Sequence, residues 1–409
     1  MAKKIVLVSS GQPSLNPRLV KEADALADAG YAVTVIHTYW NAWGADFDKQ
    51  LLPGKKWKAI CVGGDPNENK IPYFFSRLIN KIATKGKRSA WAGIAIARPA
   101  YFLIREAKKH KADLYIGHNL GALPAVVAAA ETHNKPCGFD AEDFHRNETS
   151  DDANNADVML KSHIEDKYLP RLSYFSTSSQ QIAAAYKQLY PALNPVVLLN
   201  VFPSDNSVAD KRVSTGPLKL LWFSQTIGAN RGLQDAVEAL QLLNKLNFEL
   251  HILGSKLHSN AAFINYLSNS GINLKFHEPV PPQQLITFAT QFDIGLALEP
   301  GFAVNNNLAL SNKIFTYMQA GLAIIASDTA AQQDMLSKNP TIGYVYPKGN
   351  ATALAAILSD YDNNRQQLAH NQTQALRLAR DQYNWETESK KFLAVVEQTL
   401  SAPNKKHGA

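Results

Sequence analysis

The sequence of 409 residues contains only two cysteines, Cys61 and Cys137, and it lacks any long uncharged run of apolar residues. Two thiols are too few for a disulfide framework or a four-cysteine zinc site, so a reducing compartment is expected. No apolar stretch approaches the roughly 20 residues that cross a bilayer. The run Ile5–Val8 is too short for the core of a signal peptide and is typical of a strand. These absences predict a cytoplasmic protein that does not span a membrane.

Length and charge set further bounds. A chain of this length is too long for one ordinary core and suits two domains of about 200 residues each. With 45% hydrophobic and 19% charged residues, it is expected to fold rather than to be disordered. The segment from Lys49 to Lys111 has 15 Lys and Arg against three acidic residues, an excess of +12, whereas the rest of the chain sums to −5 against the overall +7. Such an excess attracts an anionic partner: lipid head groups, nucleic acid or a phosphorylated substrate.

Short apolar runs alternate with helical patterns along the chain, which predicts an α/β fold with parallel sheets wrapped by helices. The alternation restarts after a polar, aperiodic linker at 203–217. We therefore expect one domain at 1–202, a second at 218–384 and a last helix at 385–402. In doubly wound sheets, ligands bind beyond the carboxyl ends of the strands. The predicted strands are Ile5–Ser9, Ala32–His37, Leu114–Gly117, Pro136–Phe139, Tyr174–Thr177, Leu218–Phe223, Phe248–Leu253, Ile272–His277, Ile294–Leu298 and Leu322–Ala326.

The stretch from Ser311 to Asp328 carries the strongest functional signal. Ser311 and Asn312 are good helix N-caps, apolar residues follow at helical spacing, and Gly321 ends the helix before a buried strand. A capped helix start presents backbone N–H groups and partial positive charge, which suit a phosphate, and Lys313 adds a full charge there. The alternative is an ordinary amphipathic helix with Lys313 in water.

This segment resembles the donor-site helix of the GT-B glycosyltransferases, especially the GT4-like group (glycosyl transferases group 1). The resemblance covers essentially the whole chain. It implies two Rossmann-like, doubly wound domains facing each other across a cleft, with the acceptor on the N-terminal side and a nucleotide-sugar held by the C-terminal domain. It also implies that the helix at 385–402 crosses back to the first domain. The reaction would be a retaining, metal-independent hexosyl transfer, with no cofactor and no divalent metal.

One departure from the GT4 pattern concerns a pair of glutamates spaced eight positions apart. Counting back from Gly321 puts Thr316 at the place of the second glutamate and Leu308 at the place of the first, and neither carries a carboxylate. The ribose contact expected of the second glutamate is therefore weaker, or Thr316 makes it differently.

Two glycine-containing positions of the second domain are candidates for contacts with the donor. The loop after strand Leu218–Phe223 resembles the phosphate clamp of GT4 enzymes, with Gln225 where an arginine usually lies and Arg231 near the position of the lysine. A guanidinium there can bind two phosphate oxygens, although a solvated Arg231 at a helix start is the alternative. Gly254 follows strand Phe248–Leu253 and would let the base or ribose approach.

Glu299 is the candidate catalytic carboxylate of the second domain, because it follows the strand Ile294–Leu298. A carboxylate at that position can accept hydrogen bonds from sugar hydroxyls or stabilise positive charge at the anomeric carbon. The alternative is an ordinary turn residue before Pro300 and Gly301.

The loop between the first strand and the first helix of the N-terminal domain contains Gly11 and Asn16. It resembles the GT4 loop that faces the acceptor and reaches toward the donor phosphate. Its single glycine is not a dinucleotide fingerprint. Asp46-Phe47-Asp48 matches a metal-binding pattern of another glycosyltransferase fold, but it falls in a predicted polar loop and is interpreted as a chance match.

Polar residues follow two further predicted strands of the N-terminal domain. His118 and Asn119 come after Leu114–Gly117, and Asp140 and His145 come after Pro136–Phe139. Acidic groups beside a histidine can orient an acceptor hydroxyl, so Asp140 and His145 are the candidate catalytic residues here. A structural role is the alternative for each histidine.

The basic segment at 73–91 combines aromatic and apolar residues with Arg77, Lys81, Lys85, Lys87 and Arg88. A basic helix with one apolar side can lie in the head-group region of an anionic membrane. This predicts peripheral attachment on the inner face of the cell membrane; a core-packed helix with solvated lysines is the alternative. No recognition motif supports nucleic acid as the partner.

The prediction from the whole sequence is a glycosyltransferase that acts on a glycan or lipid-linked acceptor in cell-surface polysaccharide synthesis. Two alternatives remain open. A nucleotide-sugar epimerase of the same fold would need a single substrate and no membrane surface. A non-catalytic nucleotide-sugar-binding partner of an assembly complex would explain the missing glutamates.

Overall fold

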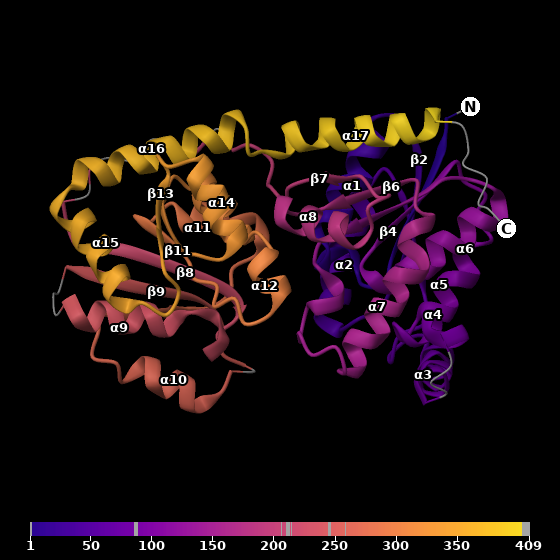
Figure 1. Ribbon diagram of the computed structural model, residues 1–409, viewed down its shortest axis with the longest axis horizontal. Helices are drawn as coiled ribbons and strands as arrows, with labels where there is room; N and C mark the ends of the chain where they lie inside the picture. The colour runs from indigo at the N-terminus through magenta and orange to yellow at the C-terminus, as the bar shows by residue number, and fades with distance from the viewer. Residues whose placement is uncertain are drawn as a thin grey trace. The chain divides into compact units, whose positions relative to one another are not determined.

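The computed structural model describes residues 2–85, 89–205, 207–209, 213, 215–243, 247–257 and 259–402. Its contacts divide the chain into two units (Figure 1), with Met1–Leu198 and Ser389–Ala409 in unit 1 and Leu199–Glu388 in unit 2. This division begins the second unit before the predicted linker at 203–217, part of which lies outside the described residues. Lys87 and Arg88 of the basic segment lie outside them as well.

Unit 1 is built on a seven-stranded parallel sheet in the order β3-β2-β1-β4-β5-β6-β7. Ile5 pairs with Val33 on one side and with Leu114 on the other, and all three side chains are buried. The strand order reverses between β1 and β4, the place where a doubly wound sheet binds ligands. The strands are β1 (Lys4–Ser9), β2 (Ala32–Thr38), β3 (Lys58–Val62), β4 (Leu114–His118), β5 (Cys137–Ala141), β6 (Tyr174–Thr177) and β7 (Pro195–Val197).

The first helix of unit 1 begins where the sequence places it. The Asn16 side chain accepts a hydrogen bond from the Leu19 N–H, and Pro17 holds the first helical position, which needs no N–H donor. Apolar residues at helical spacing then pack on the sheet. The helices of this unit are α1 (Pro17–Asp28), α2 (Ala42–Leu51), α3 (Lys70–Lys85), α4 (Ala92–Ala95), α5 (Ala100–Ala107), α6 (Leu123–His133), α7 (Ala156–Tyr168) and α8 (Gln180–Leu189).

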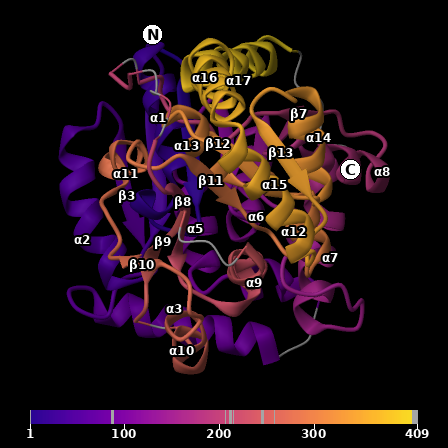
Figure 2. The ribbon, with the colours of Figure 1, turned by 90° about the vertical axis from the view of Figure 1, so that its left-hand side faces the viewer.

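Unit 2 has a six-stranded parallel sheet in the order β10-β9-β8-β11-β12-β13. Side chains alternate between its faces: Leu220 and Trp222 belong to one buried cluster and Leu221 to another. Figure 2 shows α9 and α10 on the side of these strands opposite α16. The strands are β8 (Leu218–Thr226), β9 (Phe248–Ser255), β10 (Leu274–His277), β11 (Ile294–Ala297), β12 (Ala323–Ser327) and β13 (Gly343–Tyr346).

The helices of unit 2 cover both faces of its sheet. The first cluster includes residues of α9 and α15, and the second includes residues of α13 and α16. Among the described residues, none of the helices combines the length and the apolar character that a membrane-spanning segment needs. The helices are α9 (Leu233–Leu243), α10 (Ala261–Ser268), α11 (Leu285–Ala289), α12 (Val304–Leu308), α13 (Asn312–Gln319), α14 (Ala330–Lys338), α15 (Ala351–Asn363) and α16 (Arg365–Asp381).

The last helix, α17 (Trp385–Ser401), belongs to both units. The Trp385 N–H donates to the Phe202 carbonyl in unit 2, whereas Phe392 and Val396 are buried in the core of unit 1. The helix thus begins in unit 2 and continues in unit 1, where its apolar residues belong to the core.

The predicted α/β fold with two parallel sheets is confirmed. Several strands run further than the sequence indicated: β4 reaches His118, β5 reaches Ala141 and β9 reaches Ser255. Residues that were placed just beyond the strands therefore lie within them. This difference decides where the predicted site residues lie.

Candidate functional site

The start of helix α13 brings three of the predicted residues of unit 2 together. Ser311 holds the N-cap position, but its side chain does not cap the helix; its hydroxyl donates to Glu299 Oε1 at 3.1 Å. Lys313 Nζ lies 2.5 Å from the same oxygen, and both side chains of this ion pair are 11% exposed. Asn312 is exposed beside them. The start of α13 and the segment that follows β11 thus form one polar corner. We call it the α13 corner (Glu299, Ser311, Asn312 and Lys313).

The Glu299 carboxylate is held in its ionised form. Burial by itself would raise its pKa, but the charge of Lys313 and hydrogen bonds from Lys313, Asn306 and Ser311 outweigh burial and lower that pKa. An ionised carboxylate cannot donate a proton at neutral pH. Glu299 is therefore suited to accept hydrogen bonds or to stabilise positive charge, and not to act as a general acid.

The backbone of Glu299 is fixed by the end of β12. Its N–H donates to Ser327 Oγ at 2.8 Å, the Ser327 hydroxyl lies 2.7 Å from the Glu299 carbonyl, and Gln332 Nε2 donates to Ser327 Oγ at 3.0 Å. Ser327 and Gln332 are buried. Buried, mutually bonded groups of this kind keep a side chain in one orientation. The carboxylate thus has a rigid support that sequence reasoning did not identify.

The loop after Glu299 leads into helix α12, which contributes two asparagines. Gly301 has a φ of 66°, a left-handed conformation that favours glycine, and its N–H donates to Asn306 Oδ1 at 2.6 Å. Asn306 Nδ2 reaches Glu299 Oε2 at 3.3 Å, and Asn307 Oδ1 accepts the first N–H of α14, from Ala330, at 3.1 Å. The run of asparagines at 305–307 is the only signal in the sequence that could have indicated them, because Asn side chains bond local backbone in turns.

The glycine-containing loop at 228–232 lies against the strand end that carries Glu299. Gly232 has a φ of 74°, and a Cβ there would lie 2.7 Å from Leu298 Cβ. Only glycine allows this close approach of the loop to the residue before Glu299. Arg231 and Gln225 are exposed. The backbone of Arg231 therefore lies next to the α13 corner, and its side chain is exposed there.

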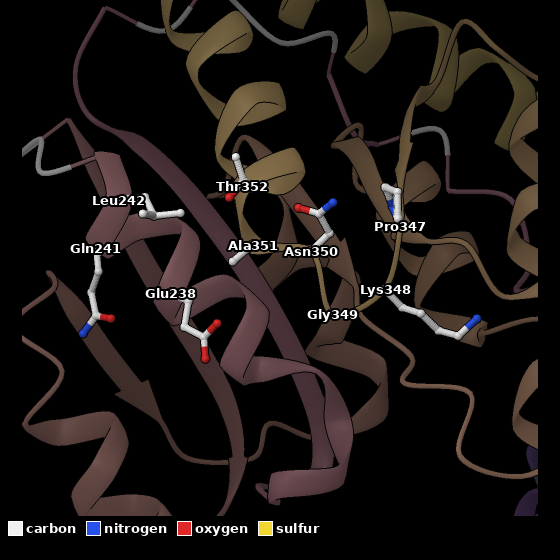
Figure 3. A pocket seen from close by; sticks show the side chains of 9 residues that line it. All are labelled: Glu238, Gln241, Leu242, Pro347, Lys348, Gly349, Asn350, Ala351 and Thr352. Atoms are coloured by element: carbon white, nitrogen blue, oxygen red, sulfur yellow. The ribbon is translucent and has the colours of Figure 1, made fainter.

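Lys348 is a third cation near this corner, and no sequence pattern indicated it. Its Cε lies 3.3 Å from the place of a Cβ on Gly301, and its Nζ lies 3.5 Å from Asp328 Oδ1. Figure 3 shows Lys348 pointing away from Glu238 and Gln241, which line a hollow of about 780 Å³ between α9 and the turn before α15. Lys348 precedes α15 in a turn, where no periodic pattern marks it.

Two predicted substrate contacts of unit 2 need correction. Gly254 lies inside β9, and a Cβ there would be 2.7 Å from the Ser224 carbonyl oxygen, so its glycine serves close packing of β8 on β9 and does not open a rim for a ligand. Thr316 is buried, with its hydroxyl 3.4 Å from the Asn312 carbonyl one turn earlier. Thr316 faces the interior, where it cannot replace the ribose contact of a glutamate. Leu308, at the position of the other glutamate, is the last residue of α12.

Asp140 was predicted to be catalytic, but its carboxylate is fully buried in an ion pair. Arg18 holds both oxygens, through Nε at 2.5 Å and Nη2 at 2.7 Å, and Ser176 Oγ donates at 2.6 Å. The pKa of Asp140 is lowered, because Arg18, His118 and these hydrogen bonds outweigh burial. A carboxylate so occupied is not available as a base, so we reassign Asp140 to a structural role.

His118 belongs to the same network and is also fully buried. Its Nε2 lies 3.1 Å from Glu22 Oε2, and Nδ1 lies 3.8 Å from Asp140 Oδ2. Burial would lower its pKa, but the carboxylates, Glu22 first, raise it. Glu22, His118 and Asp140 could geometrically hold a metal ion, but the Arg18 guanidinium already occupies Asp140. We name Arg18, Glu22, His118 and Asp140 the buried ion network.

The surroundings of this network contain two titratable groups that the sequence did not single out. The pKa of half-buried Lys21 is lowered to about 8 by burial and by the charge of Arg18. The pKa of Glu142 is raised by burial and by Asp140. Both shifts come from burial and from the charges of the buried ion network.

His145 lies in a separate buried cluster. Its Nδ1 is 3.6 Å from Glu148 Oε2, and its Nε2 is buried with no hydrogen-bond partner. Burial alone would lower the pKa of His145, but the contact with Glu148 and the negative charges of Asp143, Glu148 and Glu165 together raise it, and the contact with His145 lowers the pKa of Glu148 to about 2. His145 and Asp140 bond different partners in the structure, so the two residues do not form the pair that was predicted.

Gly11 and Asn119 are brought together, whereas Asn16 serves the helix. Ser9 Oγ donates to Asn119 Oδ1 at 2.9 Å and accepts from the Gly11 N–H at 3.1 Å, and Asn119 has a φ of 65°. Asn16 Oδ1 caps α1 through the Leu19 N–H at 3.0 Å, while Nδ2 is buried without a partner. Gly11 and Asn119 thus remain candidates for substrate contact at the carboxyl ends of β1 and β4.

Residues 231–394 match a family model described as glycosyl transferase-like, a segment that begins at Arg231 and contains the whole α13 corner. No protein of curated function matches the sequence significantly.

Solved structures match almost the whole chain. Anabaena HepE, in complex with UDP and glucose, has a TM-score of 0.68 at 12% identity and covers 97% of this chain and 100% of its own. Sucrose-phosphate synthase from Thermosynechococcus elongatus has a TM-score of 0.69 at 14% identity, covering 98% and 100%. A mutant of S. aureus TarM, in complex with Fondaparinux, alpha-GlcNAc-glycerol and UDP, has a TM-score of 0.69 at 11% identity, covering 98% and 100%. The fold is GT-B.

The resemblance that the sequence indicated is confirmed at this level. The chain forms two doubly wound sheets, with seven strands in unit 1 and six in unit 2. The family model matches residues 231–394, a segment that includes the α13 corner. At 11–14% identity, the structures establish the GT-B fold alone.

Proposed function

We propose that the chain is a glycosyltransferase that moves a sugar from a nucleotide-sugar to a glycan or lipid-linked acceptor. The observation that carries the proposal is the α13 corner, where a helix start, Lys313 and the fixed carboxylate of Glu299 meet. The family match to residues 231–394 and the presence of UDP in the HepE and TarM complexes support it.

The donor diphosphate would lie on the first turn of α13. Backbone N–H groups at a helix start and nearby cations together form a site for phosphate. Lys313 is paired with Glu299, so additional charge for the diphosphate would come from Arg231 and from Lys348, whose partly exposed contact with Asp328 at 3.5 Å is weak. These groups would balance the charge of the departing nucleotide without a divalent metal.

In the proposed reaction, the bond from the anomeric carbon to the diphosphate oxygen breaks while a bond to the acceptor oxygen forms on the same face of the sugar. The leaving phosphate oxygen takes the proton of the acceptor hydroxyl, so the anomeric configuration is retained. Glu299, ionised and fixed, would accept hydroxyl hydrogen bonds and stabilise positive charge at the anomeric carbon. Neither Thr316 nor Leu308 is required for these steps.

The test of this function is a panel of UDP-, GDP- and ADP-sugars, scored for thermal stabilisation of the full chain and for release of nucleotide. We expect one nucleotide class to stabilise the protein, by about 2.7 kcal/mol at a hundredfold excess over its Kd, and to be consumed slowly by hydrolysis or faster with an acceptor. An isomerised sugar would instead indicate an epimerase, and tight binding without turnover a non-catalytic binding partner.

Peripheral attachment to an anionic membrane is part of the proposal, and helix α3 supports it. Ile71, Phe74, Phe75, Leu78 and Ile82 lie on one helical stripe, and all are exposed, Ile71 by 85%. The opposite side is packed: Ser76 and Ala83 are buried. The exposed stripe is therefore not a core-facing side, contrary to the alternative of a core-packed helix.

The basic residues of α3 indicate that an anionic surface would cover this stripe. Lys70, Arg77, Lys81 and Lys85 lie on the same helix and are exposed. Each basic side chain near an anionic bilayer contributes about 1 kcal/mol, and the apolar stripe adds burial in the head-group region. We propose attachment at the inner face of the cell membrane, where a lipid-linked acceptor of cell-surface polysaccharide synthesis would be found.

Phe75→Glu/Leu78→Glu is expected to lower vesicle binding at least about tenfold, because two carboxylates on the stripe oppose both burial and the anionic surface. The measurement is co-sedimentation with phosphatidylcholine vesicles, with and without phosphatidylglycerol. Leu242→Glu, at an exposed leucine of unit 2, is the matched control and should bind as the wild type does. Equal binding of wild type and double variant would contradict the membrane proposal.

A further inference from the structure

The main-chain pairing of β11 with β12 ends before it reaches Glu299. The last paired residues are Ala297 and Ala326, and Glu299 lies two residues beyond Ala297. There a side chain takes the place of the strand: the Glu299 N–H donates to Ser327 Oγ at 2.8 Å, and the Ser327 hydroxyl donates to the Glu299 carbonyl at 2.7 Å. Both polar main-chain groups of one residue are therefore bonded to a single hydroxyl, as buried main-chain groups require.

This double contact fixes the direction in which the Glu299 side chain leaves the main chain. The N–H and the carbonyl flank the Cα atom, so holding both restrains the two backbone dihedrals and with them the Cα–Cβ bond. From that bond the carboxylate reaches Lys313 Nζ at 2.5 Å, Ser311 Oγ at 3.1 Å and Asn306 Nδ2 at 3.3 Å. The orientation of the carboxylate in the α13 corner thus depends on Ser327.

Gln332 of α14 determines where the Ser327 hydrogen points. A hydroxyl donates one hydrogen and accepts two, and Ser327 Oγ accepts from the Glu299 N–H and from Gln332 Nε2 at 3.0 Å. Two carbonyls lie within reach of its hydrogen, that of Glu299 at 2.7 Å and that of Ala297 at 3.5 Å. Because Gln332 Nε2 donates to the Ala297 carbonyl at 3.1 Å, the Ser327 hydrogen is left for Glu299.

The amide of Gln332 has only one favourable orientation at this place. Its Nε2 faces the carbonyls of Ala297 and Ser327, the second at 2.9 Å, and a carbonyl can only accept. Turning the amide over would place its oxygen against both of them. Gln332 is fully buried and Ser327 is 1% exposed, so solvent does not replace these bonds. The direction of every bond from Gln332 to Glu299 is therefore set.

We propose that Ser327 and Gln332 are positioning residues of the transfer reaction. Gln332 acts through Ser327, and Ser327 holds the main chain of Glu299 so that its carboxylate faces the anomeric carbon. Neither residue takes part in holding the nucleotide. The proposal rests on the proposed function and adds to it two residues that touch no substrate. The alternative is a purely structural role at the end of the sheet, which would affect stability alone.

Gln332→Leu removes the amide at nearly constant volume and should lower kcat about 10–100-fold, because a displacement of about 1 Å in a catalytic group costs that much. The Kd of the nucleotide should stay as in the wild type. The full chain is used, with the nucleotide-sugar that the panel selects for kcat and its free nucleotide for calorimetric titration. Ser327→Ala should act in the same way, whereas Ser327→Thr keeps the hydroxyl and should retain turnover.

Gln372→Leu is the matched control at the other end of the same strand. Gln372 is a buried glutamine of α16, and its Nε2 donates at 2.9 Å to the carbonyl of Asp293, the residue before β11. Its substitution removes the same side chain and leaves a carbonyl next to the same strand without its donor. Stability should therefore fall in a similar way, and the turnover of the folded protein should equal that of the wild type.

A double-mutant cycle with Glu299→Gln separates positioning from a general effect on structure. If Gln332 acts only through the Glu299 carboxylate, Gln332→Leu should have little further effect on kcat once that carboxylate is gone. A general distortion of unit 2 would lower kcat by the same factor in both backgrounds.

A further readout needs no substrate. Burial raises the pKa of Glu299, and Lys313 with its neighbours lowers that pKa by more. A carboxylate displaced from Lys313 should therefore have a higher pKa. Carbon-13 NMR of labelled glutamate carboxyls, assigned with Glu299→Gln, measures this pKa. We expect it to rise in Gln332→Leu and to stay unchanged in Gln372→Leu.

The positioning role is overturned if Gln332→Leu and Ser327→Ala keep the kcat of the wild type, or if Gln372→Leu loses as much turnover as Gln332→Leu. Equal losses in both backgrounds of the cycle, or an unchanged pKa of Glu299 in Gln332→Leu, would overturn it too. In each of these cases the wild type still consumes its nucleotide-sugar, so the transferase function stands. Absence of turnover in the wild type would instead remove the proposed function, and with it the reaction that these two residues would serve.

Discussion

Lys313→Ala should remove the thermal stabilisation by nucleotide-sugars and lower kcat/KM by about 10²–10³-fold, the usual loss when one preorganised donor to a developing negative charge is deleted. The physical reason is the position of Lys313 at the start of α13, 2.5 Å from a carboxylate that holds its ammonium in place. Nucleotide affinity and nucleotide release, measured on the same preparation, give the result.

The same substitution also leaves Glu299 buried without its cation, so a loss of stability accompanies the loss of function. Glu299→Gln separates the two effects. It keeps the ammonium of Lys313 and removes the negative charge, so nucleotide binding should persist or tighten. Turnover should fall, because the charge that stabilises the anomeric carbon is gone.

Lys338→Ala is the control, since Lys338 is an exposed lysine of the same unit whose partner Asp334 lies one helical turn away. It should change neither binding nor turnover. If Lys313→Ala retains nucleotide binding, or if Glu299→Gln loses binding and retains turnover, the diphosphate is not held at the α13 corner.

Arg18→Met should destabilise the protein by about 3–5 kcal/mol, because it leaves Asp140 and Glu22 buried without their shared cation. It also removes the hydrogen bond from Nη1 to the Leu198 carbonyl at 2.6 Å, at the end of the first segment of unit 1. Urea unfolding followed by circular dichroism measures the change.

The pH dependence of this effect has a definite sign. The folded-state pKa of Asp140 is lowered, so its contribution is fully present above the unfolded pKa of about 3.9 and is lost as the pH falls through the lower folded value. The difference between wild type and Arg18→Met should therefore narrow in acid. His118 has the opposite sign: its raised pKa means that its contribution is lost as the pH rises through the folded value.

Arg171→Met is the matched control, because the Arg171–Glu131 pair is exposed and such pairs contribute about 0–1 kcal/mol. Arg18→Met/Asp140→Leu should lose less than the sum of its single variants, since both charges disappear together. Additive losses, or an Arg18→Met protein as stable as the control, would show that the buried ion network does not stabilise unit 1.

The donor side of the molecule could be read from local sequence to a large extent. Helix α13 begins at Asn312, as predicted, because apolar residues at helical spacing follow; Ser311 holds the N-cap position, although its hydroxyl bonds Glu299 and does not cap the helix. The contact of Gly232 with Leu298 was not predicted, because it joins two segments that are distant in the sequence. Lys348 and Ser327 were missed, because they reach Glu299 and its loop only through the packing of distant strands and turns.

The sequence predicted the site residues of unit 1 less accurately, because it underestimated the length of the strands. Sequence patterns place the end of a buried strand only to within a few residues. His118 and Asp140, placed one step beyond β4 and β5, are instead inside them and fully buried. The burial of Arg18 beside them could not be inferred, since a charged residue on a helix is ordinarily solvated.

The sequence by itself determined the alternation of strands and helices, the two parallel sheets and the helix start that carries Lys313, because hydrophobic period, N-caps and glycines act within a few residues. Only the tertiary structure decided which charges are paired and which are free. Lys313 meets Glu299, Arg18 meets Asp140, and Asp46 and Glu68 are left open to solvent, because a pairing depends on residues that the fold, and not the chain, brings within a few ångströms.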